Sequence, residues 1–169
     1  MPFTPFHFGP GAVFYAVVPK HVSFLAFCVA NVIIDVEPLY FMATQQFPLH
    51  RFFHTYVGAS IILLLTITLF LGVLRLALVV PLPNVFGWKQ LTIRPVVVGA
   101  ALGSYSHIVL DSFMHSDIRP FAPFSEVNPL LLTVSLSTLH WSCFVAGIVG
   151  LIIMGIRKMF SQRSPDGMQ

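Results

Sequence analysis

Charged side chains are scarce in this chain. Its 169 residues include nine Lys and Arg and six Asp and Glu, so that 9% of the sequence is charged and 56% is hydrophobic. About a quarter of the residues of a soluble domain are charged, so this composition excludes an ordinary soluble domain and indicates an integral membrane protein. The formal net charge of +3 is too small and too scattered to indicate a nucleic-acid partner.

Cysteine is also rare, and both cysteines lie inside apolar segments. Cys28 and Cys143 are therefore predicted to be buried free thiols, which excludes a fold held together by disulfides. The first residues lack the basic stretch of a cleavable signal peptide, so we expect the N-terminus to be retained.

Long apolar runs dominate the rest of the chain and predict an all-α fold, a polytopic helical bundle in a membrane. A transmembrane helix needs about 20 apolar residues. The runs that reach this length predict three transmembrane helices, over 57–80, 95–115 and 139–156. The loop over 117–137 is expected to carry one short interfacial helix.

Two shorter helices are predicted to precede these spans, over 10–18 and 22–37. They would form an N-terminal hairpin that enters the bilayer without either arm fully spanning it, and Pro38 would end the second arm because proline disfavours helix at the residue before it. Residues 1–160 are then a single integral membrane domain, and 161–169 are a flexible polar tail.

The predicted spans bring most polar residues to one membrane surface. This surface receives His7, His50, His54, His107, His115 and His140, and also Asp35, Glu37, Asp111, Asp117 and Glu126, which leaves only His21 and Asp166 on the other. Most Lys and Arg residues fall on the opposite surface, which the positive-inside rule assigns to the cytoplasm. We therefore expect a protein of the bacterial cytoplasmic (inner) membrane whose polar site faces the periplasmic, or exoplasmic, side.

The strongest candidate site lies at the end of the predicted 95–115 helix. His107, Asp111 and His115 are spaced four residues apart and share one helix face, and Gly99 and Gly103 on that face would let a neighbouring helix approach closely. An unpaired carboxylate in lipid costs at least a few kcal/mol. A carboxylate with an imidazole one turn to either side is a set of metal ligands. His115 is equally well explained as a surface residue beyond the helix end.

His50 and His54 are also predicted to lie one turn apart, at the start of a helix that opens with Pro48. Such a pair can bind one metal from a single helix face. The alternative is two interfacial histidines whose ring tips are hydrated, which is common at membrane surfaces.

Two carboxylates and two arginines complete the candidate site. Asp35 and Glu37 would lie at a helix C-terminus, where the helix dipole disfavours negative charge and a cation would be stabilising. Arg51 and Arg119 are the only Lys or Arg residues on this surface. They could pair with the carboxylates, or they could hold the oxygens of a phosphate group.

Short blocks along residues 2–129 resemble those of a known family. They are Pro2-Phe3-Thr4-Pro5-Phe6-His7, Asp35-Val36-Glu37, His50-Arg51 with His54-Thr55, Ser106-His107 with Asp111, and Pro123-Phe124-Ser125. In this order they resemble the YdjM-like group of membrane-bound metal-dependent hydrolases. That group is distantly similar to the all-α superfamily of zinc-dependent phospholipase C and P1 nuclease.

The resemblance implies a set of metal ligands, namely His7, Asp35, His50, His54, His107 and Asp111. Glu37 stands where the family commonly has a second Asp, and the block from His50 to Thr55 is one residue shorter than the family's and lacks its glycine. These differences leave the number of metal ions open, between one and three.

The functional hypothesis is a zinc-type hydrolase of phosphoester bonds in lipids or lipid-linked substrates. Metal ions would activate water, Asp35 or Glu37 would orient the water or act as its base, and Arg51 or Arg119 would hold the phosphate. The expected partners are the lipid bilayer and a phosphoester substrate. The alternatives are a metal-ion transporter that uses the same ligands, a non-catalytic membrane protein with a structural metal, and a haem protein.

Overall fold

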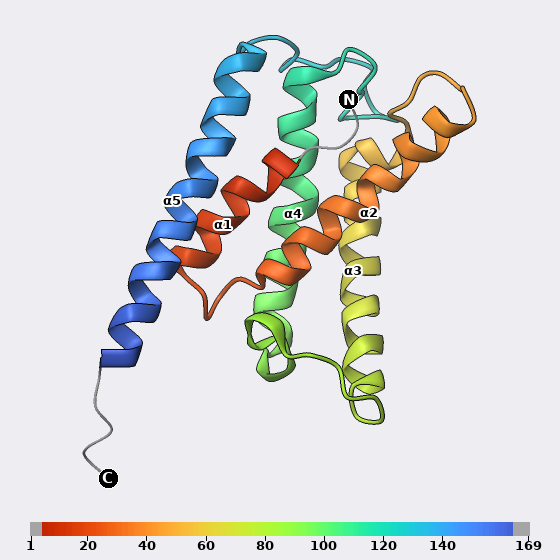
Figure 1. Ribbon diagram of the computed structural model, residues 1–169. Helices are drawn as coiled ribbons and strands as arrows, with labels where there is room; N and C mark the ends of the chain where they lie inside the picture. Colours follow the sequence, from red (N-terminus) through yellow and green to blue (C-terminus); the bar gives the residue numbers. More distant parts are fainter. Residues whose placement is uncertain (1–4, 164–169) are drawn as a thin grey trace.

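The structure, a computed structural model, describes residues 5–163, so Asp166 and residues 164–169 of the predicted tail lie outside the described residues. The described part is all-helical and contains no strand, which confirms the predicted class (Figure 1). Its α-helices are α1 (Phe8–Val17), α2 (Phe24–Ala43), α3 (Tyr56–Leu76), α4 (Ile93–Met114) and α5 (Leu136–Arg163). Three short 3-10 helices are η1 (Pro5–His7), η2 (Phe52–His54) and η3 (Val85–Gln90).

Four helices, α2, α3, α4 and α5, are long and apolar enough to cross a membrane, which indicates membrane insertion. The three predicted spans correspond to α3, α4 and α5, and α2 is a fourth candidate span. The remaining helix, α1, has 10 residues. At about 1.5 Å per residue it is roughly 15 Å long, half the thickness of a hydrocarbon core of about 30 Å.

Two local predictions are wrong. Pro38 does not end its helix, because α2 continues through it to Ala43. The Glu37 carboxylate accepts hydrogen bonds from the backbone N–H groups of Arg51 and Phe53, at 3.0 and 3.1 Å, and these contacts hold this part of α2 against η2. The predicted interfacial helix is also missing, since the described loop over 115–135 contains only turns, bends and irregular backbone.

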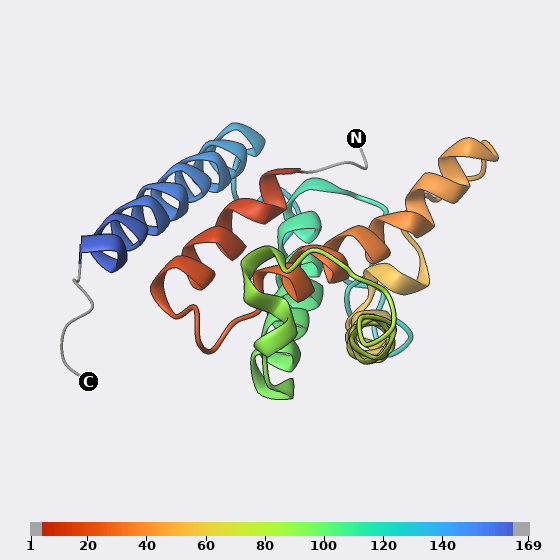
Figure 2. The same cartoon turned by 60° about the horizontal axis from the view of Figure 1, so that its bottom comes forward.

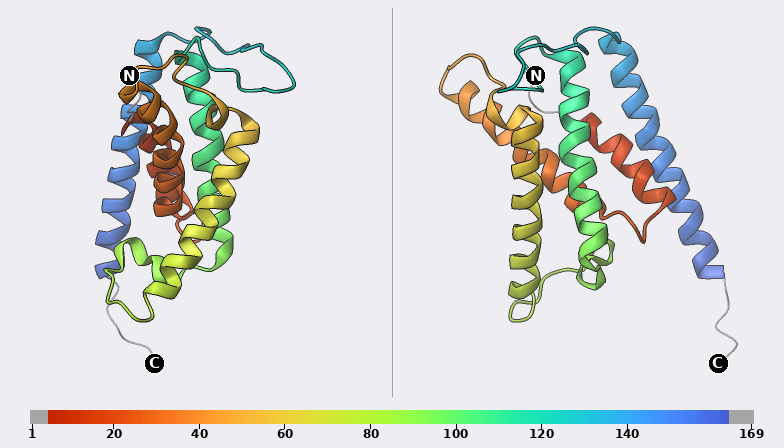
Figure 3. Two further views of the ribbon diagram at one scale, coloured as in Figure 1. Left: turned by 90° about the vertical axis from the view of Figure 1, so that its right-hand side faces the viewer. Right: turned by 180° about the vertical axis from the view of Figure 1, so that it is seen from behind.

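Successive helices run in opposite directions, as predicted. The ends of α2 and α4 and the starts of α3 and α5 therefore lie at the same end of the bundle (Figures 1 and 3). Figure 2 shows α5 and α1 on one side and α3 on the other, with α4 between them, and α2 runs from the middle out past α3. In this arrangement α5 packs mainly on α1, whereas α4 packs on α2 and α3.

Close packing of α2 on α4 depends on glycine, as the sequence predicts. A Cβ atom at Gly103 would overlap the backbone carbonyl oxygen of Phe27, and one at Gly99 would overlap the backbone of Ser23. The backbone N–H of Ser23 also donates a 2.9 Å hydrogen bond to the carbonyl oxygen of Pro95. This contact sets the position of α2, and of its polar residues, against α4.

Replacing Gly103 with alanine should therefore destabilise the protein by about 1–3 kcal/mol, because the overlapping atom belongs to the backbone and cannot rotate away. Gly72→Ala in α3 is the matched control, since a Cβ there has no neighbour within 4 Å. Thermal unfolding in detergent measures both. An unchanged melting temperature for Gly103→Ala would contradict the close contact.

Candidate metal centre

The candidate site is built around Asp111, which lies near the end of α4 and is 2% exposed. Three histidines direct Nε2 at its carboxylate. The distances are 3.1 Å from His7, 3.2 Å from His107 and 3.5 Å from His54. His7 is the last residue of η1, His54 is the last residue of η2, and His107 lies within α4. Three separate parts of the chain therefore meet at one buried carboxylate.

The α4 part of this site forms as the sequence predicts. His107 and Asp111 are four residues apart on one helix face, and both side chains are buried. His115, the residue that caps α4, is in extended backbone and directs its ring to His50, with ring centroids 4.3 Å apart.

The predicted helical pair of His50 and His54 is wrong. α3 begins only at Tyr56, His50 lies in irregular backbone, and His54 ends η2. The two rings nevertheless lie close together, with centroids 4.6 Å apart. Backbone contacts from distant residues replace the helix, because Asp117 accepts hydrogen bonds from the N–H groups of Leu49 and His50.

Three of the histidines share one pattern of contacts. In each of them a polar oxygen lies against Nδ1, and the pairs are His107 with Asn31 at 3.0 Å, His54 with Glu37 at 3.4 Å, and His50 with Asp117 at 2.9 Å. An acceptor at Nδ1 holds the proton there and leaves the Nε2 lone pair free to bind a cation.

The Nε2 atoms make no hydrogen bonds of their own. Nε2 of His50, His54 and His107 is buried without a hydrogen bond in the described part of the chain, as are both ring nitrogens of His7, although the Asp111 carboxylate lies 3.1–3.5 Å from three of these Nε2 atoms. Buried polar atoms are almost always satisfied, so a group of unpartnered atoms around a carboxylate needs an explanation. Coordination of a metal ion by these atoms is such an explanation, and their imidazole and carboxylate groups suit a transition-metal ion.

Two sets of ligand atoms are close enough to hold an ion, and Asp111 belongs to both. The first set is Asp35, His54, His107 and Asp111, which are all buried, and the second is His50, Asp111 and His115. Within each set the ligand atoms lie within 4.8 Å of one another. The buried cluster can therefore hold a metal ion, and its two halves meet at Asp111.

The predicted ligands have distinct places in this cluster. Asp35 lies 3.3 Å from Nε2 of His107, and His50, His54 and Asp111 fall into the two sets described above. His7 belongs to neither set, but it contacts Asp111, and its ring lies 4.4 Å from that of His107. His7 is thus adjacent to the first set.

Burial keeps the outer histidines neutral. The pKa of His50 is lowered to about 4, mainly by desolvation and in addition by the neighbouring imidazoles of His54 and His115, and the contact with Asp117 opposes this only in part. Desolvation also lowers the pKa of His115. Near neutral pH both rings are therefore uncharged, which is the form that binds a metal.

Arg51 and Arg119 lie beside the centre and not on its carboxylates. Both line a cavity of about 530 Å³ that also reaches His50 and Asp117. The Arg51 guanidinium stacks over the ring of Phe41 at 3.6 Å, and its Nε donates to the carbonyl oxygen of Pro48. Nη1 of Arg119 donates to the carbonyl oxygens of Ser116 and Ile118, while Nε lies 3.7 Å from Glu126.

Sequence reasoning did not assign a role to Asn31 or Asp117. Asn31 is 2% exposed and lies one helical turn before Asp35 on α2. The signal that points to it is a polar residue within an otherwise apolar helix, on the same face as Asp35. Asp117 was placed on the correct surface, but its pairing with His50 spans 67 positions and leaves no local pattern. His140 lies outside both ligand sets and instead stacks on Phe6, with centroids 4.9 Å apart.

Replacing Asp117 with asparagine should lower metal affinity about 10- to 100-fold, because the residue that orients a histidine ligand contributes an effect of that size. The change removes the charge that faces Nδ1 of His50. Glu126→Gln is a suitable control, since it lies in the same cavity and pairs with Arg119. Competition with a zinc-sensitive dye would measure both affinities. Equal metal affinities of the Asp117→Asn and Glu126→Gln proteins would show that Asp117 does not orient a metal ligand.

Comparison of the chain with family models, with curated proteins and with solved structures finds no match.

Proposed function

We propose that this chain is a membrane-embedded, metal-dependent hydrolase of phosphoester bonds in lipids, with two zinc-type ions that share Asp111. The observation that carries the proposal is the convergence of buried, unpartnered Nε2 atoms on one carboxylate. A hydrolytic role is supported by the shared carboxylate, because paired metal sites recur in enzymes that cleave phosphoesters.

In this proposal each ligand set holds one ion. Asp35, His54 and His107 would complete the first site, and His50 and His115 the second, with Asp111 common to both. Zinc is favoured because nitrogen and carboxylate ligands in such sites suit it. Bound zinc would supply a water molecule of lowered pKa and would polarise the phosphate group.

The carboxylates are assigned different tasks. Glu37 already accepts hydrogen bonds from two backbone N–H groups and faces Nδ1 of His54, so its role is to position that ring. Asp35 contacts Nε2 of His107 through Oδ1, at 3.3 Å, and its side chain is 11% exposed. We therefore assign Asp35, besides its place among the ligands, as the group that takes the proton from the attacking water.

The cavity beside His50 would take the phosphate. Arg51 and Arg119 reach it from two different loops, and guanidinium groups bind phosphate oxygens through paired hydrogen bonds. Its lining includes the apolar residues Phe52, Ala122 and Pro123, and Phe52 is 47% exposed. Phe124, the next residue after Pro123, is 86% exposed. Asp117 and Glu126 line the same cavity, so its formal charges balance. Its apolar rim favours a lipid headgroup over a soluble phosphoester.

The distribution of charge supports a placement in the cell. Lys20, Lys89 and Arg157 lie on or next to the segments at the end of the bundle remote from the candidate metal centre. The positive-inside rule favours the cytoplasm for this end, and the metal centre would then face the periplasm from the bacterial inner membrane.

The test is phospholipid hydrolysis by the purified protein in liposomes, followed as release of phosphorylated headgroup or of inorganic phosphate. We expect activity that a chelator abolishes and zinc restores. A zinc-sensitive dye inside the same liposomes distinguishes the transporter alternative. Bound metal with neither hydrolysis nor zinc flux would contradict the proposal and leave a structural metal site.

Replacing both Arg51 and Arg119 with alanine should reduce kcat/KM about 100- to 10,000-fold, because each charge-assisted hydrogen bond to phosphate contributes about 1.5–3 kcal/mol and about 1.4 kcal/mol is a factor of ten. The main change should be in KM, with metal content unchanged, since neither arginine belongs to a ligand set. Arg94→Ala at the other end of α4 controls for the loss of surface charge. Unchanged kinetics in the double variant would exclude this cavity as the phosphate site.

A further inference from the structure

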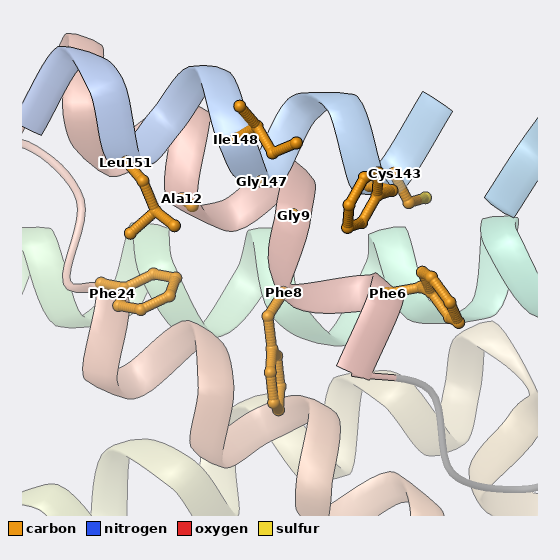
Figure 4. A pocket seen from close by; sticks show the side chains of 10 residues that line it. Phe6, Phe8, Gly9, Ala12, Phe24, Cys143, Gly147, Ile148 and Leu151 are labelled. Atoms are coloured by element: carbon orange, nitrogen blue, oxygen red, sulfur yellow. The ribbon is translucent and has the colours of Figure 1, made fainter. Parts of the chain in front are cut away.

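A groove runs along α5 on the side that faces α1. One cavity of about 460 Å³ lies between α1, α2 and α5 and is lined by Ala12, Phe24, Ile148 and Leu151, among others (Figure 4). A second cavity of about 510 Å³ is lined by Ser137, His140 and Trp141 near the start of α5. Phe6 and Phe144 line both cavities, so the two lie next to each other along α5, and together they are called the groove.

The groove has the length of one leaflet. It extends along α5 from Ser137 to Leu151, which at 1.5 Å per residue is roughly 21 Å. Half of a bilayer of about 40–45 Å, headgroup regions included, is about 20–22 Å. The groove therefore covers the leaflet on the histidine side and ends near the middle of the bilayer.

The polarity of the groove changes along its length in the same way as that of a lipid. Its inner part is lined by apolar side chains, and Figure 4 shows Phe24 and Leu151 at this end, with Phe6 and Cys143 at the other. Its outer part offers the polar groups of Ser137, His140 and Trp141, and tryptophan is enriched at membrane interfaces. A single molecule with a polar head and one long apolar chain fits both parts.

The backbone keeps this groove open. α1 lies so close to α5 that a Cβ atom at Gly9 would overlap the carbonyl oxygen of Cys143, and one at Gly150 would approach the backbone of Ala12. Because glycines stand at this contact between α1 and α5, they contribute no side chain that could fill the space beside it. On the outer side of the groove, Phe144, Ile148 and Leu151 are 42–66% exposed, so the groove is continuous with the lipid-facing surface of α5.

We propose that this groove binds one phospholipid of the leaflet on the histidine side, with an acyl chain along α1 and α5 and the glycerol ester region at Ser137, His140 and Trp141. This lipid is a bound component of the protein and not its substrate, since the cavity proposed to take the phosphate lies beside His50. The bound lipid would support α1. This helix begins directly after His7, and His7 contacts Asp111. The proposal does not depend on hydrolytic activity.

Native mass spectrometry in a mild detergent tests the lipid directly. The wild-type chain should retain one phospholipid, and Ile148→Trp and Leu151→Trp should reduce its occupancy at least tenfold, because an indole would fill the apolar cavity. Ile152→Trp is the matched control, since Ile152 is 55% exposed on the same helix and lies outside both cavities. Equal occupancy in all four proteins, or no retained lipid in the wild type, would overturn the proposal.

A second measurement needs no variant. Vesicles of phosphatidylglycerol with a photoreactive group at the end of one acyl chain should label Ile148 and Leu151 in the wild-type protein more strongly than Ile152. Labelling that is even around α5 would show ordinary contact with bulk lipid and would overturn the proposal. A disulfide between two copies of Ile148→Cys would identify a second protein chain as the occupant and would overturn it as well.

Discussion

Replacing Asp111 with alanine should remove both metal ions from the protein and abolish hydrolysis. Asp111 is the one residue common to the two ligand sets, and three histidines direct Nε2 at it. Loss of a residue that only orients a ligand lowers metal affinity about 10- to 100-fold, so loss of a shared ligand should exceed that range. Metal content by mass spectrometry should fall from two ions per chain to a small fraction of one.

The control for this variant is Ser112→Ala. Ser112 follows Asp111 in α4, is equally buried, and donates its hydroxyl to the carbonyl oxygen of Ile108. It should keep its full metal content, and size-exclusion profiles of both variants establish that they are folded. A wild-type protein without stoichiometric metal, or an Asp111→Ala protein that retains both ions, would refute the central hypothesis.

Removing single histidines should separate the two ions. His54 belongs only to the first set and His50 only to the second, although their rings lie 4.6 Å apart. His54→Ala and His50→Ala should therefore each retain one ion and lose the other by more than about 100-fold in affinity. Metal content should fall by half in each single variant and to nearly zero in the double variant.

Cobalt substitution gives the same experiment a spectroscopic readout. The two single variants should give different absorption spectra, because the remaining ion would have the ligands of a different set. If each single variant lost all of its metal, the cluster would hold one ion that uses both histidines, and the assignment of two ions would be wrong. Full retention in both variants would exclude these residues as ligands.

The parts of the site that follow local periodicity could be predicted from the sequence. His107 and Asp111 lie on one helix face, and the alternation of apolar helices brings His7, Asp35 and His50 to the same end of the bundle. The free state of both cysteines was likewise predictable from their apolar surroundings, and it is confirmed.

The parts that depend on long-range contacts could not be predicted. Pro48 suggested a helix that would carry His50, but hydrogen bonds to Asp117 hold this segment in an irregular conformation. Pro38 suggested a helix end, but Glu37 is held by N–H groups 14 and 16 positions away, and α2 continues. The effect of proline on local backbone conformation is smaller than the combined effect of several long-range hydrogen bonds. A single sequence does not reveal such hydrogen bonds.

The candidate ligands are far apart in the sequence, and this separation constrains the order in which they can come together. Asn31 and His107 lie 76 positions apart, and His7, near the start of the described chain, contacts Asp111 in the fourth α-helix. As the chain is synthesised from its N-terminus, neither ligand set is complete until α4 has entered the bilayer. Any ion that uses either set can therefore bind only after the first four helices are in place. α5 adds no member to either set and packs mainly on α1.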